Sequence, residues 1–215
     1  MIEGAASNIG LYSIVDAARL LKTERRTLAR WVQGYTENLK SEVKAYAPVI
    51  AGGRDSLLTF GDLIELMYVK GFRERRVELE TIRQVSAKYS KQWETEYPFA
   101  TKRFAIGARE ILLQESDEWS ECLSGQGFVF ADRIAEQLVH TGDLASEWHP
   151  LGRDRAVVVD PRRSFGKPID TNSGTSTYVL YKATEGGDSA ESVAWWYGTN
   201  VESVLDSREF EISLL

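Results

Sequence analysis

Apolar residues near the amino terminus recur at helical spacing in two short blocks that follow one another directly. In the first block, Val15, Ala18 and Leu21 are three residues apart, which predicts one buried helix face. Ser13 stands just before this block and Asp16 follows three positions later, which is the spacing of a reciprocal capping pair. We therefore expect a short helix that begins near position 14.

The second block predicts a helix with two contrasting faces. Leu28, Trp31 and Val32 are spaced to point inward, and Thr23 precedes them as the expected helix cap. The positions expected to point outward are Arg25, Arg26 and Arg30. Two short helices joined by a tight turn, the second of them basic, are typical of a helix-turn-helix.

The basic second helix has the chemistry needed to read the major groove of DNA. Its cations can contact phosphates, and hydroxyl or guanidinium groups in its first turn can reach base edges. The candidate DNA-binding residues are Thr23, Arg25, Arg26, Thr27, Arg30, Tyr35 and Arg54. The competing interpretation is a solvated helix of a small bundle, because arginine-rich exposed faces are common.

A hairpin is expected after these helices. Val49 and Ile50 have the composition of one strand, residues 57–60 that of the other, and residues 52–55 that of the tight turn between them. Arg54 would then stand at the hairpin tip, where it could contact a flanking phosphate. A surface hairpin with an incidental arginine is the alternative.

Two segments together resemble the winged helix-turn-helix of MerR-like DNA-binding domains. The first consists of S-I-x-D-A-A-x-L-L at residues 13–21 and T-L-x-R-W at residues 27–31, and the second is residues 57–85. The resemblance implies a wing strand at 58–60, a helix at 62–69, a glycine-containing turn at 71–72 and a last helix at 79–89.

The middle of the chain, from Pro98 to His149, is expected to be a connector with short elements of its own. Residues 103–107 and 110–114 have the composition of strands, and residues 128–140 that of a helix. The large aromatic residues near this segment are Tyr97, Trp119 and Trp148. Basic residues do not interleave with them in the way a single-strand binding platform would require, so we expect them in a core or a subunit interface rather than stacked on bases.

The carboxyl-terminal pattern predicts a strand at 156–159 and helices at 178–184, 190–197 and 201–210, with Ser189 and Asn200 at cap positions. The order D-P, G-K-P, S-G-T and three short helices resembles a small bacterial module of unknown function, at residues 156–211. Members of that module family look like antitoxins, many of them encoded beside PIN-domain ribonucleases. Phe165 and the loop at 170–173 depart from the family pattern, so we assign this copy to partner contact rather than to DNA binding.

Length and composition indicate how many domains to expect. The chain of 215 residues is long enough for two ordinary domains, and an apolar content of 43% is typical of a globular protein. We expect a winged helix-turn-helix domain at 1–95, a connector at 96–150 and a helical module at 151–215, in a mainly α fold with small β elements. No apolar run reaches membrane-spanning length, no export signal is evident, and the single cysteine, Cys122, cannot form an internal disulfide, so we expect a cytoplasmic protein.

The charge is unevenly distributed. The whole chain carries a net charge of −6, yet residues 1–110 carry about +4 and the remainder about −10. Phosphate neutralisation is local, so an acidic second half does not prevent DNA binding if it faces away from the duplex.

No catalytic residues, metal or cofactor are expected. His140 and His149 do not make a metal-ligand spacing with Cys122 or with each other, although a thiol–imidazole pair formed by the fold is an enzymatic alternative. Residues 164–168 superficially resemble a phosphate-binding loop, but they lack its spacer and its hydroxyl residue, and Pro168 removes an amide donor. We therefore expect a protein that is not an enzyme.

Together the two resemblances imply a VapB-like type II antitoxin that binds operator DNA as a homodimer and neutralises a PIN-domain ribonuclease toxin. A homodimer also has a physical reason, since two related copies on a palindrome multiply the weak discrimination of one short helix. Two alternatives stay open. One is a MerR-like transcription regulator that senses a ligand at 98–149, and the other is a scaffold that does not bind DNA.

Overall fold

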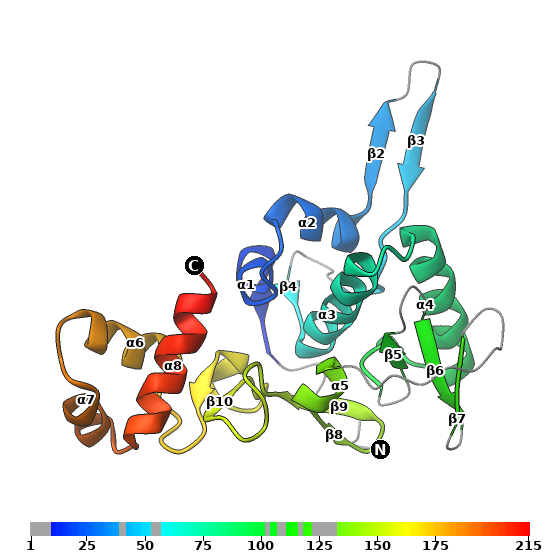
Figure 1. Cartoon of the computed structure of the whole chain (residues 1–215). Helices are drawn as coiled ribbons and strands as arrows, with labels where there is room; N and C mark the ends of the chain where they lie inside the picture. Colours follow the sequence, from blue (N-terminus) through cyan, green and yellow to red (C-terminus); the bar gives the residue numbers. More distant parts are fainter. Residues whose placement is uncertain are drawn as a thin grey trace.

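The computed structural model describes residues 10–38, 42–52, 57–101, 104–106, 111–115, 118–121 and 133–215. Helices predominate in these residues, and the strands form small antiparallel sheets. Figure 1 shows the amino-terminal helices and a projecting hairpin on one side of the molecule, and three carboxyl-terminal helices on the other. This arrangement agrees with the expected mainly α fold with small β elements.

The amino-terminal part alternates short strands and helices. Its elements are β1 (Tyr12–Ser13), α1 (Ile14–Leu20), α2 (Arg25–Gln33), β2 (Tyr35–Asn38), β3 (Val43–Tyr46), β4 (Leu57–Leu58), α3 (Phe60–Glu74) and α4 (Leu79–Trp93). Strand β1 pairs with β4, and β2 pairs with β3. Because β1 and β4 pair antiparallel and each is followed by a helix, α1 and α3 begin at opposite ends of this short ladder.

Helices α1 and α3 start with the same capping arrangement. The Ser13 hydroxyl accepts the Asp16 N–H at 3.1 Å, and the Asp16 carboxylate accepts the Ser13 N–H at 3.1 Å. Thr59 and Asp62 repeat this exchange at 3.2 and 2.8 Å. The capping pair expected at Ser13 is confirmed. The implied wing strand at 58–60 is wrong beyond Leu58, because Thr59 serves as the cap of α3 instead.

Two details of the helix-turn-helix differ from expectation. Val15, expected on the buried face of α1, is 52% exposed, because the side of this helix that faces the core is the one with Ala17. The residues that α1 buries are Ala17, Ala18 and Leu20. Thr23 does not cap α2, because its hydroxyl donates to the carbonyl of Leu21 at 3.1 Å. Glu24 occupies the cap position and makes no side-chain capping bond.

The expected hairpin is wrong in its strands. Val49 and Ile50 lie in a bend and are buried in the core, and the Val49 N–H donates to the Trp31 carbonyl at 2.7 Å. Residues 57–58 pair with β1 instead. The hairpin that forms is β2–β3, in which Tyr35 lies opposite Tyr46. Arg54, expected at the tip, lies outside the described residues.

Helix α3 is longer than the resemblance implied. It runs through positions 71–72, where a turn was expected, and ends at Glu74. Phe72 is fully buried and packs edge-on against Phe99, with 5.2 Å between ring centroids. Burial of this ring explains why the helix continues past Gly71. Helix α4 buries Ile82, Val85 and Tyr89, and it extends to Trp93, beyond the last helix implied at 79–89.

The middle region is richer in strands than expected. Its elements are β5 (Phe104–Ile106), β6 (Ile111–Glu115), β7 (Glu118–Glu121), α5 (Arg133–Gln137), β8 (Leu138–Thr141) and β9 (Leu144–Trp148). The two expected strands correspond to β5 and β6. The helix expected at 128–140 is wrong at its end, because Leu138 begins a strand that pairs with β9 and is fully buried there. Residues 128–132 lie outside the described part.

The carboxyl-terminal part follows the expected order closely. Its elements are β10 (Val157–Val158), η2 (Ser164–Gly166), β11 (Ile169–Asp170), α6 (Thr177–Glu185), α7 (Ala190–Tyr197) and α8 (Val201–Ser213). The Ser189 hydroxyl accepts the Ser192 N–H, and the Asn200 side chain accepts the Ser203 N–H, which confirms both expected caps. The Asp170 carboxylate accepts bonds from Ser173 and Thr199, so it joins the loop before α6 to the turn after α7.

The main core joins the two ends of the chain. It contains residues of α1 to α4 together with Trp148, Val157, Val159 and Phe210, so α8 packs on the amino-terminal helices. A second, smaller core lies among α6, α7 and α8 and consists of Leu180, Val193, Ala194 and Val204. No helix in the described ranges is long and apolar enough to cross a membrane.

Candidate nucleic-acid interface

Helix α2 presents a cationic first turn on an apolar base. Leu28, Trp31 and Val32 are buried, as expected, and fix the helix against the core. Arg25 and Arg26 are exposed, and neither forms an ion pair with any residue that the structure describes. The first turn also has no side-chain cap, so its backbone N–H groups remain available to an anion. This turn therefore has the properties of a phosphate-binding surface.

Arg30 has a different role in the fold. Its Nη2 lies 2.9 Å from Glu37 Oε1 on β2, and its guanidinium carbon lies 3.7 Å from the centre of the Tyr35 ring. The Tyr35 ring stacks on Tyr46 of β3, with 4.6 Å between centroids and 18° between planes. Arg30 and Tyr35 thus join α2 to the hairpin stem.

Helix α4 supports the same stem from the other side. The Arg83 guanidinium donates to the Ala47 carbonyl at 2.9 Å, and its carbon lies 5.9 Å from the centre of the Tyr46 ring. Gly34 enters the hairpin with φ of 72°, and a Cβ at this position would lie 2.4 Å from the Tyr46 carbonyl oxygen. Only glycine fits so close an approach with a positive φ. The hairpin direction is therefore set by α2, α4 and Gly34.

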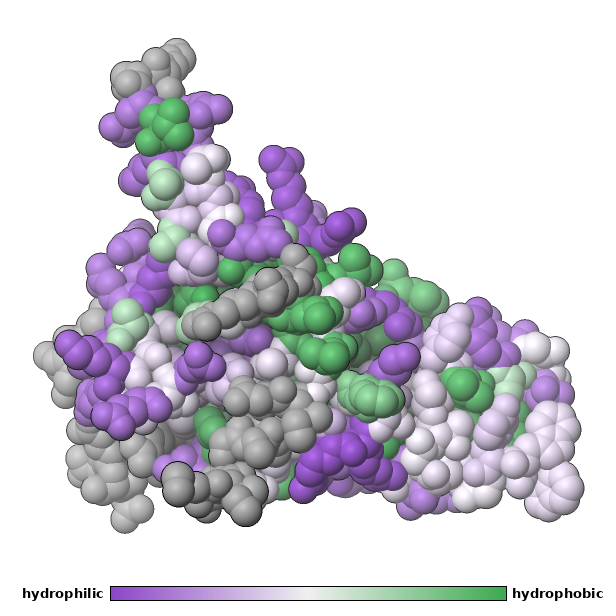
Figure 2. All heavy atoms as spheres, turned by 180° about the vertical axis from the view of Figure 1, so that it is seen from behind, coloured by the Kyte–Doolittle hydropathy of each residue, from purple (hydrophilic) through white to green (hydrophobic). Residues whose placement is uncertain are grey.

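The structure brings the candidate residues into two groups. Arg25, Arg26 and the half-buried Thr27 share the first turn of α2, whereas Arg30 and Tyr35 lie at the base of the hairpin. Thr23 remains in the turn between the helices, bonded to the Leu21 carbonyl. Figure 2 shows the hairpin projecting from the body, with hydrophilic side chains along it and around its base.

The sequence interpretation did not single out several residues that shape this surface. They are Glu37, Lys44, Tyr46 and Arg83. The sequence does contain a signal for the β2–β3 hairpin, because Tyr35 and Tyr46 flank two short polar segments that can pair as strands. Among the described residues, no group of three or more histidine, cysteine, aspartate or glutamate side chains could hold a metal ion.

Comparison with known proteins supports the amino-terminal assignment. Residues 10–85 match a family model described as "Putative DNA-binding HTH domain". The chain is 25% identical to a Mycobacterium tuberculosis H37Rv protein named "Putative antitoxin VapB45", over 94% of each chain. Its fold is similar to the crystal structure of Rv2018 from Mycobacterium tuberculosis, with a TM-score of 0.62 at 21% identity over 91% of this chain and 96% of the other. The chain therefore carries an amino-terminal helix-turn-helix domain of a DNA-binding type and shares its fold with Rv2018.

Proposed function

We propose that this protein is the antitoxin of a type II toxin–antitoxin pair, which binds operator DNA as a homodimer and neutralises a PIN-domain ribonuclease. The observation that carries the proposal is the first turn of α2, where Arg25 and Arg26 are exposed without ion-pair partners in the described residues. The similarity to the protein named "Putative antitoxin VapB45" along nearly the full chain supports the part of the proposal that concerns toxin binding.

In this proposal α2 enters the major groove with its first turn foremost. Arg25 and Arg26 contact phosphates or guanine edges, and Thr27 contacts a neighbouring base or phosphate. The β2–β3 hairpin serves as the wing and follows the backbone, with Lys44 available to a flanking phosphate. Arg30 and Tyr35 hold the hairpin in place, and Thr23 and Arg54 remain candidates for further phosphate contacts.

A homodimer follows from the small size of the reading element. One nine-residue helix contacts only a few base pairs, which is too few to find a single site among many competing sites. Two copies on a palindrome place two such helices in successive major grooves, about 34 Å apart. Sedimentation of the protein with a palindromic duplex should give two protein chains per duplex, and one chain per duplex would contradict the dimer.

The DNA-binding proposal is tested by a salt titration with paired variants. Arg25→Gln with Arg26→Gln should weaken binding to the upstream operator duplex at least tenfold. If both side chains contact phosphates, the slope of log K against log salt should fall by about two, since each contact contributes about 0.9. Arg208→Gln is the matched control, because Arg208 is an exposed arginine on α8. Equal loss in both variants would indicate non-specific attraction and contradict a reading role for α2.

The toxin-binding proposal is tested by co-expression with the protein encoded by the neighbouring gene. That protein should have ribonuclease activity alone, lose it in the presence of this chain, and purify with this chain as a complex. A neighbour that is not a ribonuclease, or one that stays fully active in the mixture, would contradict antitoxin function. Operator binding would still be measured separately by the salt titration.

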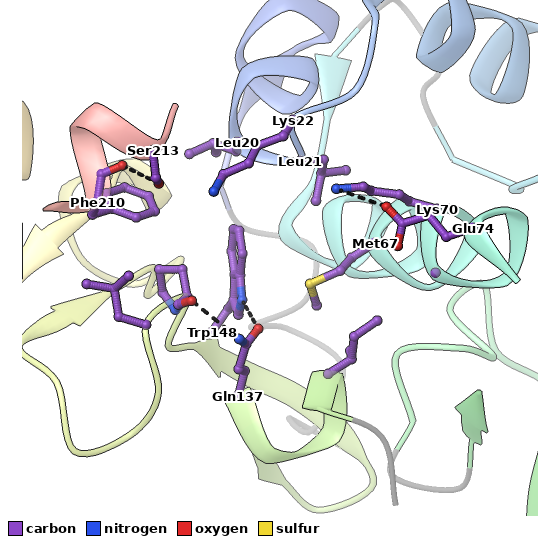
Figure 3. A pocket seen from close by; sticks show the side chains of 14 residues that line it. Leu20, Leu21, Lys22, Met67, Lys70, Glu74, Gln137, Trp148, Phe210 and Ser213 are labelled. Atoms are coloured by element: carbon purple, nitrogen blue, oxygen red, sulfur yellow. Dashed lines mark hydrogen bonds and ion pairs between the residues drawn. The ribbon is translucent and has the colours of Figure 1, made fainter. Parts of the chain in front are cut away.

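A cavity at the junction of the two ends favours one second candidate, a ligand-sensing regulator. The cavity measures about 280 Å³ and lies where α1, α3, α5, β9 and α8 meet. Figure 3 shows Trp148 in its wall, bonded to Gln137, with Lys22 and Met67 facing the same space. Under this candidate, operator affinity changes when a small molecule fills the cavity. Under the antitoxin proposal, the protein binds its operator with the same affinity whether or not a small molecule is present.

A further inference from the structure

Large aromatic side chains are exposed on α7, although the unit that carries them has a very small core. Trp195 is 80% exposed and Trp196 is 55% exposed. The core among α6, α7 and α8 holds only four buried side chains within the described residues, and two of these are valines. Burial of an indole removes more apolar surface from water than burial of valine does. The outward position of both tryptophans therefore indicates a partner rather than a packing role.

The acidic residues around α7 have no ion-pair partner among the residues that the structure describes. Glu191 lies one helical turn before Trp195, Glu202 lies in the first turn of α8, and both are exposed. Neither forms an ion pair in the described parts of the chain, nor do Glu185 and Asp188 in the turn that precedes α7.

Acidic residues elsewhere on α8 behave differently. Asp206 and Glu209 pair with Arg155 at 2.7 and 2.6 Å, and Glu211 pairs with Arg19 at 2.5 Å. Within the carboxyl-terminal helices, the carboxylates that form no ion pair in the described residues therefore lie near the two ends of α7, the helix that carries the exposed tryptophans. We call Glu191, Trp195, Trp196 and Glu202 the α7 face.

The α7 face is held on a rigid support, away from the DNA-binding surface. Ser189 caps the start of α7, Gly198 ends it in the left-handed conformation, and the Thr199 hydroxyl donates to Asp170 at 2.6 Å. Figure 1 shows α7 at the end of the molecule farthest from the β2–β3 hairpin. A rigid surface loses little conformational entropy on binding, and this one can be occupied while α2 contacts DNA.

The charge of the α7 face restricts its partner. Nucleic acid is repelled by the unpaired carboxylates. A second copy of the chain is also disfavoured, because an interface between identical faces would bring like charges together. The remaining fit is a basic protein groove that also accepts planar rings, and the RNA-binding groove of a ribonuclease has both properties.

We propose that the α7 face occupies the RNA-binding groove of the ribonuclease toxin as a mimic of single-stranded RNA. Glu191 and Glu202 take the place of phosphates, and Trp195 and Trp196 take the place of stacked bases. The inhibitor and the RNA substrate therefore compete for one groove. This inference rests on the antitoxin function proposed above and specifies the surface that performs it.

The test uses the full chain and the ribonuclease from the co-expression experiment. Trp195→Ser with Trp196→Ser should weaken binding to the ribonuclease at least thirtyfold in calorimetry and restore RNA cleavage. Glu191→Gln with Glu202→Gln should weaken it about tenfold at low salt and reduce its salt dependence. Val15→Ser and Glu136→Gln are matched controls outside the α7 face, and they should bind as the unchanged chain does. An uncleavable RNA oligonucleotide should displace the unchanged chain.

Each outcome separates this inference from the function on which it rests. If the unchanged chain does not bind the ribonuclease, the antitoxin function fails and the inference fails with it. If it binds and the tryptophan variant binds equally well, or if RNA and the chain bind together, the inference alone is overturned. Conversion of a dimer to a monomer by the tryptophan variant would also overturn it, since the α7 face would then be a contact between copies. The variant's operator binding and thermal unfolding should remain unchanged, which excludes misfolding.

Discussion

The most unusual single residue in the amino-terminal part is Glu65, a carboxyl group in the middle of α3. It is fully buried, its Oε1 accepts the Ala100 N–H at 2.8 Å, and its Oε2 has no hydrogen-bond partner among the described atoms. Burial raises the pKa of Glu65 well above its ordinary value. Hydrogen bonds from two backbone N–H groups oppose that shift, and the nearby Asp62 carboxylate adds to it. Glu65 is therefore protonated over a wider pH range in the folded protein than in the unfolded chain.

This raised pKa predicts a pH-dependent loss of stability that Glu65→Gln should remove. A group whose folded pKa is raised stabilises the fold fully below its unfolded pKa, and the contribution is lost as pH rises towards the folded pKa. The unchanged protein should lose about 1.4 kcal/mol of unfolding free energy for each unit of pKa shift. The glutamine variant, which keeps the Ala100 bond, should lose less. Urea unfolding from about pH 5 to about pH 8 measures the difference, with the exposed Glu136→Gln as control. A constant gap between variant and parent across this range would contradict the prediction.

At the scale of elements, the hairpin is positioned by two stacked aromatic rings with a cationic side chain at each end of the row. The row runs from Arg30 on α2 through the stacked pair Tyr35 and Tyr46 to Arg83 on α4. Aromatic pairs contribute about 0.5–1.5 kcal/mol beyond their buried area, and a cation over a ring contributes about 0.5–1 kcal/mol at an exposed site. A two-stranded hairpin is marginal by itself, so these contacts largely decide where it points.

Tyr35→Ala should therefore loosen the hairpin without unfolding the core. Amide exchange should increase in β2 and β3, and operator affinity should fall several-fold, because the hairpin no longer stays beside α2. Tyr35→Phe retains the stack and the contact with Arg30, so it should behave as the unchanged protein does. Hydrogen exchange and duplex titration together check both variants. If Phe and Ala weaken DNA binding equally, the Tyr35 hydroxyl contacts DNA directly and the positioning role is wrong.

Element boundaries were predictable from sequence where local chemistry fixes them. The limits of α7 follow from Ser189 and Gly198, and the start of α1 follows from Ser13 and Asp16, because caps and glycine stops act within a few residues. Strand pairing was not predictable in the same way. Residues 57–58 pair with a strand more than forty positions earlier, and periodicity carries no information about such partners.

In the candidate site too, features set by neighbouring residues were predictable, and features that depend on distant residues were not. Exposure of Arg25 and Arg26 was predictable, since it follows from the buried stripe of α2. The partners of Arg30 were not, because Glu37 and Tyr35 reach it only after the hairpin forms. Val15 was misplaced for a related reason. A helix of seven residues has too few turns for spacing alone to decide which side faces the core.

At the scale of the molecule, the carboxyl-terminal part is docked on α1, the first helix of the helix-turn-helix. The Tyr12 hydroxyl donates to the Gly166 carbonyl at 2.8 Å, and Arg19 pairs with the buried Glu211 at 2.5 Å. Burial, followed by the charge of Asp160, raises the pKa of Tyr12 above its ordinary value, so this hydroxyl remains a donor. The glycine of the G-K-P motif thus has a physical role at this contact.

Gly166→Ala should weaken the contact between the carboxyl-terminal part and α1. Its cost should exceed that of an alanine at another glycine with positive φ, where no side chain is in the way. Gly166 has φ of 78°, and a Cβ there would lie 2.1 Å from the Tyr12 hydroxyl oxygen. Gly187 has φ of 100° with nothing within 4 Å of its Cβ position, so Gly187→Ala carries strain without a clash. The control should lose about 1 kcal/mol of unfolding free energy, and Gly166→Ala about 2 kcal/mol more.

Denaturant unfolding measures the difference in unfolding free energy between these glycine variants. In Gly166→Ala, amide hydrogen exchange should increase in α1 and α8. Gly166→Ala combined with Tyr12→Ala should cost less unfolding free energy than the sum of the two single substitutions, because the clash requires both side chains. Equal costs for the two glycine variants would mean that the Tyr12 contact does not hold the carboxyl-terminal part in place. Selective loosening of α1 and α8 would instead show that α1 supports both α2 and the docked carboxyl-terminal part.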